Sequence, residues 1–244
     1  MTVDRGWSPQ GAARIGRPPI GWGLPDTLLA WVAGLVASAL AVLPWVDPDE
    51  GTVEGIVPLL VALVVQSAAI LAVLVAVSRT KGRRRLRLDF GLVVRPRDAA
   101  WLALGGLFGL LTNVLLLPIV HLADLDESPQ EVTRRLEDAA GLELAFFALA
   151  VVAVAPVVEE LLFRGALQRA LQRRTSPGRA VFAAAVLFGA VHLTDPGSYP
   201  VLPGLVGLGI VTGVVAVRSG DLSRPILLHA GFNLLTVLGV LADR

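Results

Sequence analysis

The chain contains no cysteine, which excludes disulfides, thiol catalysis and thiolate metal sites. Charge is also scarce, because only 17% of the 244 residues are Asp, Glu, Lys or Arg, whereas about 25% is usual in soluble domains. The formal net charge of +1 gives no indication of a nucleic-acid partner. With 55% hydrophobic residues and a mean hydropathy of +0.70, the composition indicates a single domain that crosses a membrane several times.

Apolar runs long enough to cross a bilayer recur along the chain. A spanning helix needs about 20 mainly apolar residues, and seven segments approach or exceed this length, of which the fifth and sixth are short. We therefore predict an all-α polytopic membrane protein with about seven transmembrane helices. The predicted spans are residues 24–44, 56–78, 98–121, 142–168, 180–193, 201–217 and 225–241.

Basic and acidic side chains alternate between the predicted connections. Lys and Arg gather in the second, fourth and sixth connections, whereas the first, third and fifth are acidic or nearly uncharged. Because short cytoplasmic loops are enriched in Lys and Arg, this pattern predicts a cytoplasmic N-terminus and an external C-terminus in the plasma membrane. Residues 1–23, rich in Pro and Gly, form a predicted cytoplasmic tail, and residues 24–121 form the N-terminal transmembrane helices.

Two local patterns carry structural predictions. Ser128-Pro129-Gln130-Glu131 has the capping box and the early proline that begin a helix. It predicts a short helix over 129–140 within an extracytoplasmic linker, residues 122–141. In the sixth span, Gly209 and Gly213 form a GxxxG pair, which is typical of closely packed membrane helices.

Few polar groups inside the predicted spans are able to support chemistry. A charged group near the centre of a bilayer costs roughly 2.5–3.5 kcal/mol on insertion scales and usually marks function. The candidates lie in the fourth, fifth and seventh spans, which predicts a polar catalytic cavity between these three helices. They are Glu159, Glu160, Arg164, His192, His229 and Asn233.

Helical spacing predicts how these side chains are grouped. Glu160 and Arg164 are four residues apart and share a face, so an ion pair is expected that leaves Glu159 as the free carboxylate. His229 and Asn233 have the same spacing and can face one cavity. On straight helices the three groups lie at different depths below the basic ends of their helices. At 1.5 Å per residue, Glu160 is roughly 14 Å, His192 roughly 20 Å and His229 roughly 8 Å from the nearest flanking arginine. A common site therefore requires a tilt or kink near Pro156, or a later start of the fifth helix.

The chemistry open to this set is the activation of water. A carboxylate can accept a proton from water while an imidazole shares the acid–base work, and a His–Asn pair can donate hydrogen bonds to an oxyanion. Glu159, His192 and His229 can instead hold zinc with an open water position, although the chain lacks HExxH. A structural interpretation also remains open, in which the ion pair, the histidines and Asn233 only join helices.

Three motifs occur in order and resemble those of the CPBP family, the CAAX proteases and bacteriocin-processing enzymes also called the Abi family. EExxxR corresponds to residues 159–164, FxxxH to 188–192 and HxxxN to 229–233. The resemblance covers roughly residues 142–235, and it implies that residues 142–244 form a CPBP-like catalytic transmembrane core. The resemblance implies an intramembrane endopeptidase that cleaves near the cytoplasmic membrane face, so the lipid bilayer and a membrane-associated peptide or protein substrate are the expected partners.

The resemblance also implies roles for the six residues. Glu159 and His192 are expected to activate water, His229 and Asn233 to stabilise the oxyanion, and Glu160 with Arg164 to support the site. A glutamate mechanism without a cofactor is favoured, with zinc as the possible alternative. Two other functions remain open: a non-catalytic membrane scaffold or bacteriocin-immunity protein of the same family, and a transporter that uses the buried carboxylates as an ion site.

Overall fold

The protein is helical throughout the part of the chain that the computed structural model describes, which comprises residues 21–49, 51–122, 133–134, 137, 139–194 and 196–242. An isolated bridge between Val46 and Val53 is the one strand-like pairing in these ranges. Most of the short helix expected over 129–140, and residues 1–20 of the expected tail, lie outside them. The elements are α1 (Leu24–Val42), η1 (Leu43–Trp45), α2 (Ile56–Lys81), α3 (Leu86–Asp89), η2 (Pro96–Asp98), α4 (Ala100–Leu122), α6 (Gly141–Leu149), η3 (Ala150–Val154), α7 (Ala155–Glu160), η4 (Leu161–Gln168), α8 (Arg169–Gln172), α9 (Pro177–Ala190), η5 (Val191–Thr194), η6 (Pro196–Ser198), α10 (Leu202–Ser219) and α11 (Ser223–Ala242).

Seven helices in the described ranges are long and apolar enough to cross a membrane, which confirms the predicted fold class. The fourth is the longest and runs without interruption from Gly141 to Gln172. The fifth spans Pro177–Thr194 and thus begins before the predicted residue 180. The later start considered for this helix is therefore wrong. The reason is local, since Pro177 occupies the first helical turn, where its missing N–H costs nothing and its fixed φ suits the helix.

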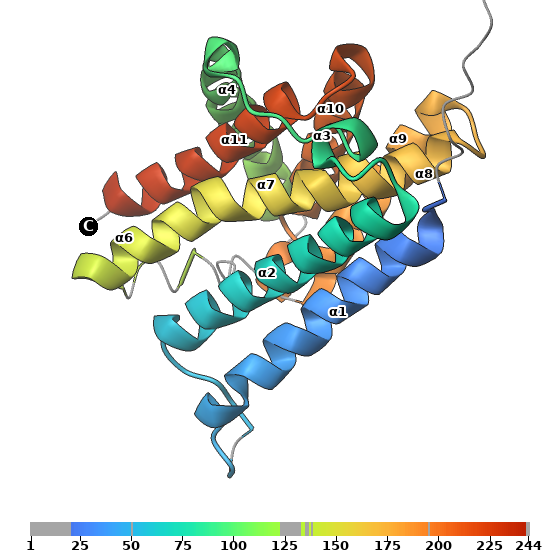
Figure 1. Ribbon diagram of the computed structural model, residues 1–244. Coiled ribbons are helices and arrows are strands. Elements are labelled where there is room, and N and C mark those ends of the chain that lie inside the picture. The colour runs from blue at the N-terminus through green and yellow to red at the C-terminus, as the bar shows by residue number, and fades with distance from the viewer. Residues whose placement is uncertain are drawn as a thin grey trace, which may run out of the picture.

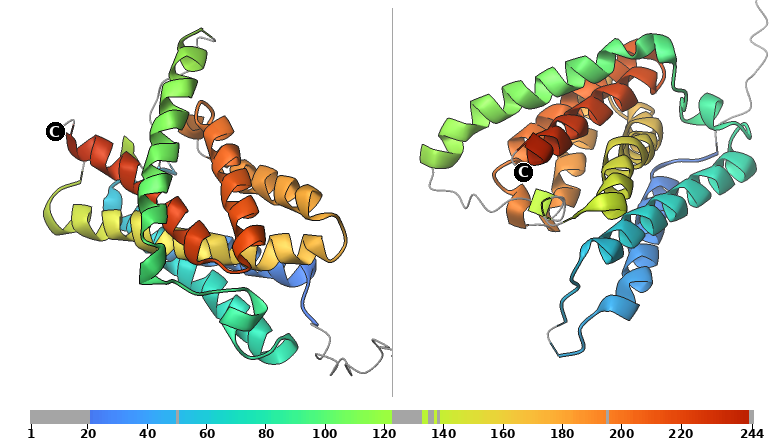
Figure 2. Two further views of the ribbon diagram at one scale, coloured as in Figure 1. Left: turned by 90° about the horizontal axis from the view of Figure 1, so that it is seen from above. Right: turned by 90° about the vertical axis from the view of Figure 1, so that its left-hand side faces the viewer.

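The long helix from α6 to α8 runs through the middle of the molecule (Figure 1). The α1–α2 hairpin packs on one side of it, and α11 lies along the other side. Helix α4 crosses α11 and packs on it, while α10 packs against both α9 and α11 (Figure 2). The three helices that carry the candidate site residues are thus neighbours in space.

Glycines allow two pairs of helix backbones to touch. A Cβ atom on Gly231 of α11 would overlap the carbonyl oxygen of Leu102 in α4, and one on Gly105 would overlap that of Leu228. The same holds for the predicted GxxxG pair, where a Cβ on Gly209 would lie 2.9 Å from Cα of Ala185 in α9. The role predicted for that pair in close helix packing is confirmed.

A polar clamp fixes the start of α11. The guanidinium of Arg95 lies 2.8 Å from Asp221, and its backbone N–H donates to Ser223 Oγ over 2.9 Å. In the same place Arg224 Nε donates to Asp98 over 3.3 Å. The connection before α4 is therefore tied to the helix that carries His229 and Asn233, so residues outside the three motifs help to position them.

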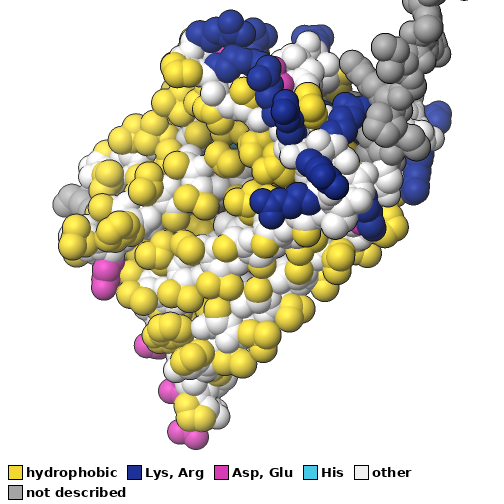
Figure 3. Space-filling model, in the orientation of Figure 1, with side chains coloured by type: hydrophobic (Ala, Val, Ile, Leu, Met, Phe, Trp, Pro, Cys, Tyr) yellow, Lys and Arg dark blue, Asp and Glu magenta, His cyan; other side chains and the backbone are white. Residues whose placement is uncertain are grey.

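The surface divides by charge and hydropathy. Lys and Arg side chains gather toward the upper and right-hand parts of the molecule, around α3, α8 and the start of α9, whereas Asp and Glu lie at the lower left (Figure 3). Between them the surface is largely apolar, with exposed leucines and valines on most of the long helices. A broad apolar zone between polar ends is the surface that a bilayer requires, and the chain is a multi-pass membrane protein.

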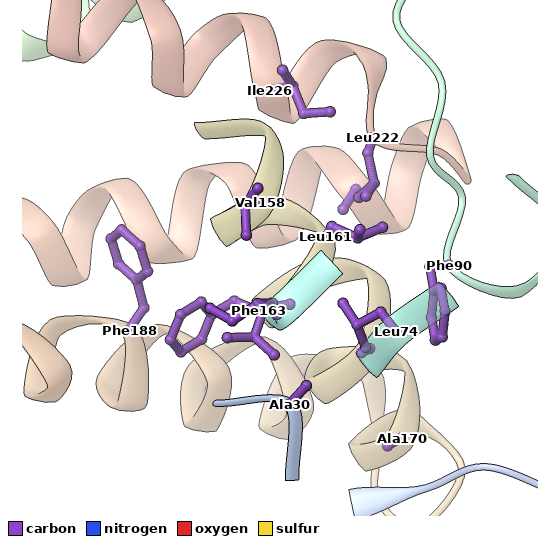
Figure 4. Close-up of a cluster of buried hydrophobic side chains, with 14 of the residues drawn as sticks. Ala30, Leu74, Phe90, Val158, Leu161, Phe163, Ala170, Phe188, Leu222 and Ile226 are labelled. Atoms are coloured by element: carbon purple, nitrogen blue, oxygen red, sulfur yellow. The ribbon is translucent and has the colours of Figure 1, made fainter. Parts of the chain in front are cut away.

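Beneath this surface, apolar side chains from six helices form one buried cluster. Ala30 of α1, Leu74 of α2, Phe188 of α9 and Ile226 of α11 all belong to it, and all are at most 4% exposed. Figure 4 shows these side chains together with Phe163 of η4, which also belongs to the cluster. The candidate site residues are therefore set against a rigid, close-packed interior.

Candidate active site

The long helix carrying Glu159 and Glu160 changes to π geometry on both sides of them. The π-helical segments are η3 and η4, and the α-helical turn between them, α7, ends at Glu160. Such segments are rare and are often found at functional sites. They flank Pro156, the position at which a distortion was expected, although the helix continues through the region without a break.

The π geometry explains the position of Asn233. Within η3 the N–H of Ala155 bonds to the carbonyl of Ala150, so the α-helical partner of the Val151 carbonyl is lost. The next possible partner is residue 156, which is proline and has no N–H. The amide of Asn233 supplies the missing donor, with Nδ2 2.9 Å from the Val151 oxygen. One N–H of Asn233 therefore joins α11 to the fourth span.

Glu160, Arg164 and His229 form a buried polar cluster. They are 0%, 1% and 3% exposed, respectively. The guanidinium of Arg164 lies 3.1 Å from Glu160 Oε1, which confirms the predicted ion pair, and His229 Nδ1 lies 3.0 Å from the same oxygen. The contact with His229 joins the fourth and seventh spans and was not expected. Because a lone buried charge is costly, each member of this cluster depends on the others.

Glu159 occupies a different environment from its neighbour. Its side chain is 30% exposed, and its Oε2 lies 3.7 Å from His229 Nε2. The imidazole of His229 is therefore placed between two carboxylates, with one nitrogen toward each. The prediction that Glu159 is a free carboxylate is therefore only partly right, because Glu159 has His229 as a partner. Of the two adjacent glutamates it is nevertheless the accessible one, since the side chain of Glu160 is fully buried.

His192 is anchored through Phe188. His192 lies in η5, one turn after Phe188, and its Nδ1 is 2.8 Å from the Phe188 carbonyl oxygen. A carbonyl only accepts, so Nδ1 carries the proton and Nε2 of the neutral ring is left with its lone pair.

The ring of Phe188 is a meeting point that the sequence did not reveal. Its centroid lies 5.1 Å from that of His192 and 5.5 Å from that of His229, both in edge contacts. The guanidinium carbon of Arg164 lies 4.5 Å from the same centroid. The FxxxH motif places a phenylalanine here, but the spacing alone could not show that both histidines contact one ring.

Not all six residues are joined. Glu159, Glu160, Arg164 and His229 contact one another, and His192 meets them through Phe188. Asn233 has no hydrogen bond or ion pair to the other five candidates in the described part of the chain. Two hollows of the surface, of about 550 and 300 Å³, are lined by none of the six. The polar cavity between the fourth, fifth and seventh spans remains a prediction.

The arrangement does not suit a zinc site. Zinc in catalytic sites takes three protein ligands around one point. Among the described residues, no three His, Cys, Asp or Glu side chains are grouped in a way that could hold a metal ion. No step of the chemistry below is therefore assigned to a metal.

Comparison with known families agrees with the motif resemblance. Residues 141–235 match the family model described as type II CAAX prenyl endopeptidase, Rce1-like. This segment is similar to an Rce1-like domain, and it contains all six candidate residues and both π-helical segments. No curated protein and no solved structure matches the chain.

Proposed function

We propose that the protein is a glutamate-type intramembrane endopeptidase that hydrolyses a peptide bond of a membrane-associated protein or peptide. The observation that carries this proposal is the contrast between the two adjacent carboxylates. Glu160 is fully buried between Arg164 and His229, whereas the side chain of Glu159 is 30% exposed. Glu159 is thus the carboxylate that water and a substrate can reach, and it is assigned as the general base.

Glu159 and His192 together handle the protons. Glu159 takes a proton from the attacking water, whose oxygen adds to the scissile carbonyl carbon. The nitrogen of the leaving amine must then gain a proton, and His192 Nε2 is suited to relay it, because Nδ1 is held by the Phe188 carbonyl. The two side chains are brought into one region by Phe188 and His229.

His229 is assigned to the oxyanion that forms on the scissile carbonyl. Its Nδ1 is fixed by Glu160, so Nε2 is the nitrogen available to a ligand. Donation from Nε2 requires the imidazolium form, in which both ring nitrogens carry a proton. In this assignment Glu160 and Arg164 do not touch the substrate and instead hold His229 in place.

The assignment of Asn233 to the same oxyanion relies on its second amide proton. One N–H is used by the Val151 carbonyl, and a side-chain amide has two. The bond to Val151 fixes the orientation of the amide, which is the kind of preorganisation an oxyanion site needs.

The proposal is tested by exposing the purified protein to a fluorogenic peptide library in detergent, with and without a chelator. Glu159→Gln should abolish cleavage, and Glu143→Gln, at an exposed position of the same long helix, should leave it unchanged. Activity that persists in Glu159→Gln would contradict the assignment, and loss of activity with chelator would instead favour metal chemistry. A protein that binds partners without cleaving any peptide would support the scaffold or immunity alternative.

We further infer that the protein lies in the plasma membrane with its N-terminus in the cytoplasm. The segregation of basic and acidic side chains to different parts of the surface supports this orientation. The partners implied are the lipid bilayer and the peptide or protein substrate, with no nucleic acid.

A further inference from the structure

An apolar groove of about 550 Å³ lies beside the long central helix. One wall is α1, through Leu24, Leu28 and Trp31, and the other is formed by Leu187 of α9 and Val191 of η5. Leu28 is 58% and Leu187 is 47% exposed, so the groove opens onto the lipid-facing surface.

The floor of the groove runs along the long helix from Phe163, through Leu167, to Leu171, and Arg174 lies in the turn that follows this helix. At no more than about 1.5 Å per residue, Phe163 and Leu171 are at most roughly 12 Å apart along the helix axis, and Arg174 lies beyond Leu171. The hydrocarbon core of a bilayer is about 30 Å thick, so one leaflet accounts for about half of this. The groove therefore has the length of a single acyl chain, with a charged group where the headgroup of that lipid would lie.

The charge at this end of the groove is positive and uncompensated. Arg174 is exposed, and its guanidinium has no hydrogen bond or ion pair within the described ranges, although its backbone N–H donates to the Leu171 carbonyl. Its neighbour Arg173 is held in place, since its guanidinium stacks 4.2 Å from the Trp22 ring centroid and donates to the Trp22 carbonyl over 2.7 Å. Burial, and then the nearby charge of Arg174, hold the pKa of Arg173 below its usual value. Two guanidinium groups so close together favour an anion between or beside them.

We propose that this groove binds an anionic phospholipid, with one acyl chain between α1 and α9 and the phosphate at Arg174. A zwitterionic lipid would place a cationic group near the two arginines and is therefore disfavoured. A bound apolar segment of a protein partner would fill the groove but would not need Arg174. The proposal is independent of proteolysis, since none of the six candidate site residues lines the groove.

A lipid bound in the groove would nevertheless affect the side chains that contact the candidate catalytic residues. Phe163 lies on the groove floor, and its ring contacts that of Phe188 edge-on at 5.3 Å. Phe188 in turn contacts both histidines. The end of the acyl chain is thus separated from the catalytic histidines by two aromatic rings, which gives the lipid a route to stabilise their positions.

Trp31 provides a native probe for the bound chain, because it lines the groove. The full chain is reconstituted in phosphatidylcholine vesicles that contain a small fraction of phosphatidylglycerol or phosphatidylcholine with brominated acyl chains, and tryptophan fluorescence is recorded. Brominated phosphatidylglycerol should quench several-fold more than brominated phosphatidylcholine at equal content. Trp31→Phe should remove this difference, which assigns it to the groove rather than to the other four tryptophans.

Arg174→Gln tests the recognition of the phosphate, with Arg179→Gln as the matched control at another exposed arginine nearby, in the first turn of α9. The preference for phosphatidylglycerol should disappear in the first variant and persist in the second, while circular dichroism shows both folded. Equal quenching by the two lipids in the parent protein would overturn the proposal. A preference that survives Arg174→Gln or Trp31→Phe would also overturn it, since the lipid would then lie elsewhere.

Discussion

Nδ1 of His229 lies 3.0 Å from Oε1 of Glu160, and both side chains are almost completely buried. This contact links the EExxxR and HxxxN motifs, which are 69 residues apart in the sequence. It also separates the roles of two adjacent glutamates. Glu160 is tied to the protein interior, whereas Glu159 lies on the accessible side of His229 and is the carboxylate that we propose as the base.

Glu160 and Arg164 should stabilise the folded protein only when both charges are present. Glu160→Gln and Arg164→Gln each leave one buried charge without its partner, and each should lower the free energy of unfolding by roughly 3–5 kcal/mol. The double variant should lose less than the sum of the two. A double-mutant cycle on thermal unfolding in detergent measures this, and strictly additive losses would show that the two groups do not interact.

Asn233 should show two separable effects. Asn233→Ala removes the donor to the Val151 carbonyl, which should cost about 1–3 kcal/mol of stability, and it removes an oxyanion donor, which should reduce kcat by roughly 10²–10³-fold. Pro156→Ala restores an N–H at the position that π geometry would pair with Val151.

The double variant Pro156→Ala with Asn233→Ala distinguishes the two roles. It should recover stability but not turnover, as measured by unfolding and by cleavage of the same peptide. If turnover returned together with stability, Asn233 would act only by supporting the helix and the oxyanion role would be wrong.

Phe188 should matter to catalysis although it cannot take part in it chemically. Phe188→Leu keeps the position apolar but removes the ring that contacts His192, His229 and Arg164. Because small displacements of catalytic groups can cost up to about 10²-fold in rate, kcat should fall with KM little changed. Steady-state kinetics beside Phe182→Leu, at a 61% exposed position of the same helix, provides the comparison. Equal kcat values in the two variants would show that Phe188 does not position the catalytic side chains.

Gly231 should be intolerant of any side chain. A Cβ there would overlap the carbonyl oxygen of Leu102, so Gly231→Ala must push α11 away from α4. Both the melting temperature and the rate of cleavage should fall. Gly239→Ala, on the same helix with no atom within 4 Å of the added Cβ, should instead be neutral or slightly stabilising, because alanine favours helix over glycine by about 0.5–1 kcal/mol. A similar response of both variants would contradict the close contact.

The features that follow from local spacing could be predicted from the sequence. The seven apolar spans depend on length and composition, and the Glu160–Arg164 pair depends on an i, i+4 relationship within one helix. The contact of Gly209 with α9 follows from the GxxxG pattern. In each case the information lies within a few helical turns of a single segment.

The features that depend on how helices meet could not be predicted. Nothing local to His229 indicates that it bonds to Glu160, and the Val151 carbonyl is free only because the helix adopts π geometry before Pro156. That proline was the one signal for a distortion, and it led to the expectation of a kink. Gly105, far from any motif, holds α11 in place through a backbone contact that no periodicity reveals.

The central claim is that Glu159, and not Glu160, acts as the base. It is tested most directly by the turnover of Glu159→Gln and Glu160→Gln on one peptide, each measured below its own melting temperature and normalised to folded protein. We predict no detectable turnover for Glu159→Gln with a melting temperature like that of the parent, and reduced stability with residual turnover for Glu160→Gln. Full turnover in Glu159→Gln together with none in Glu160→Gln would contradict the account and reverse the two roles.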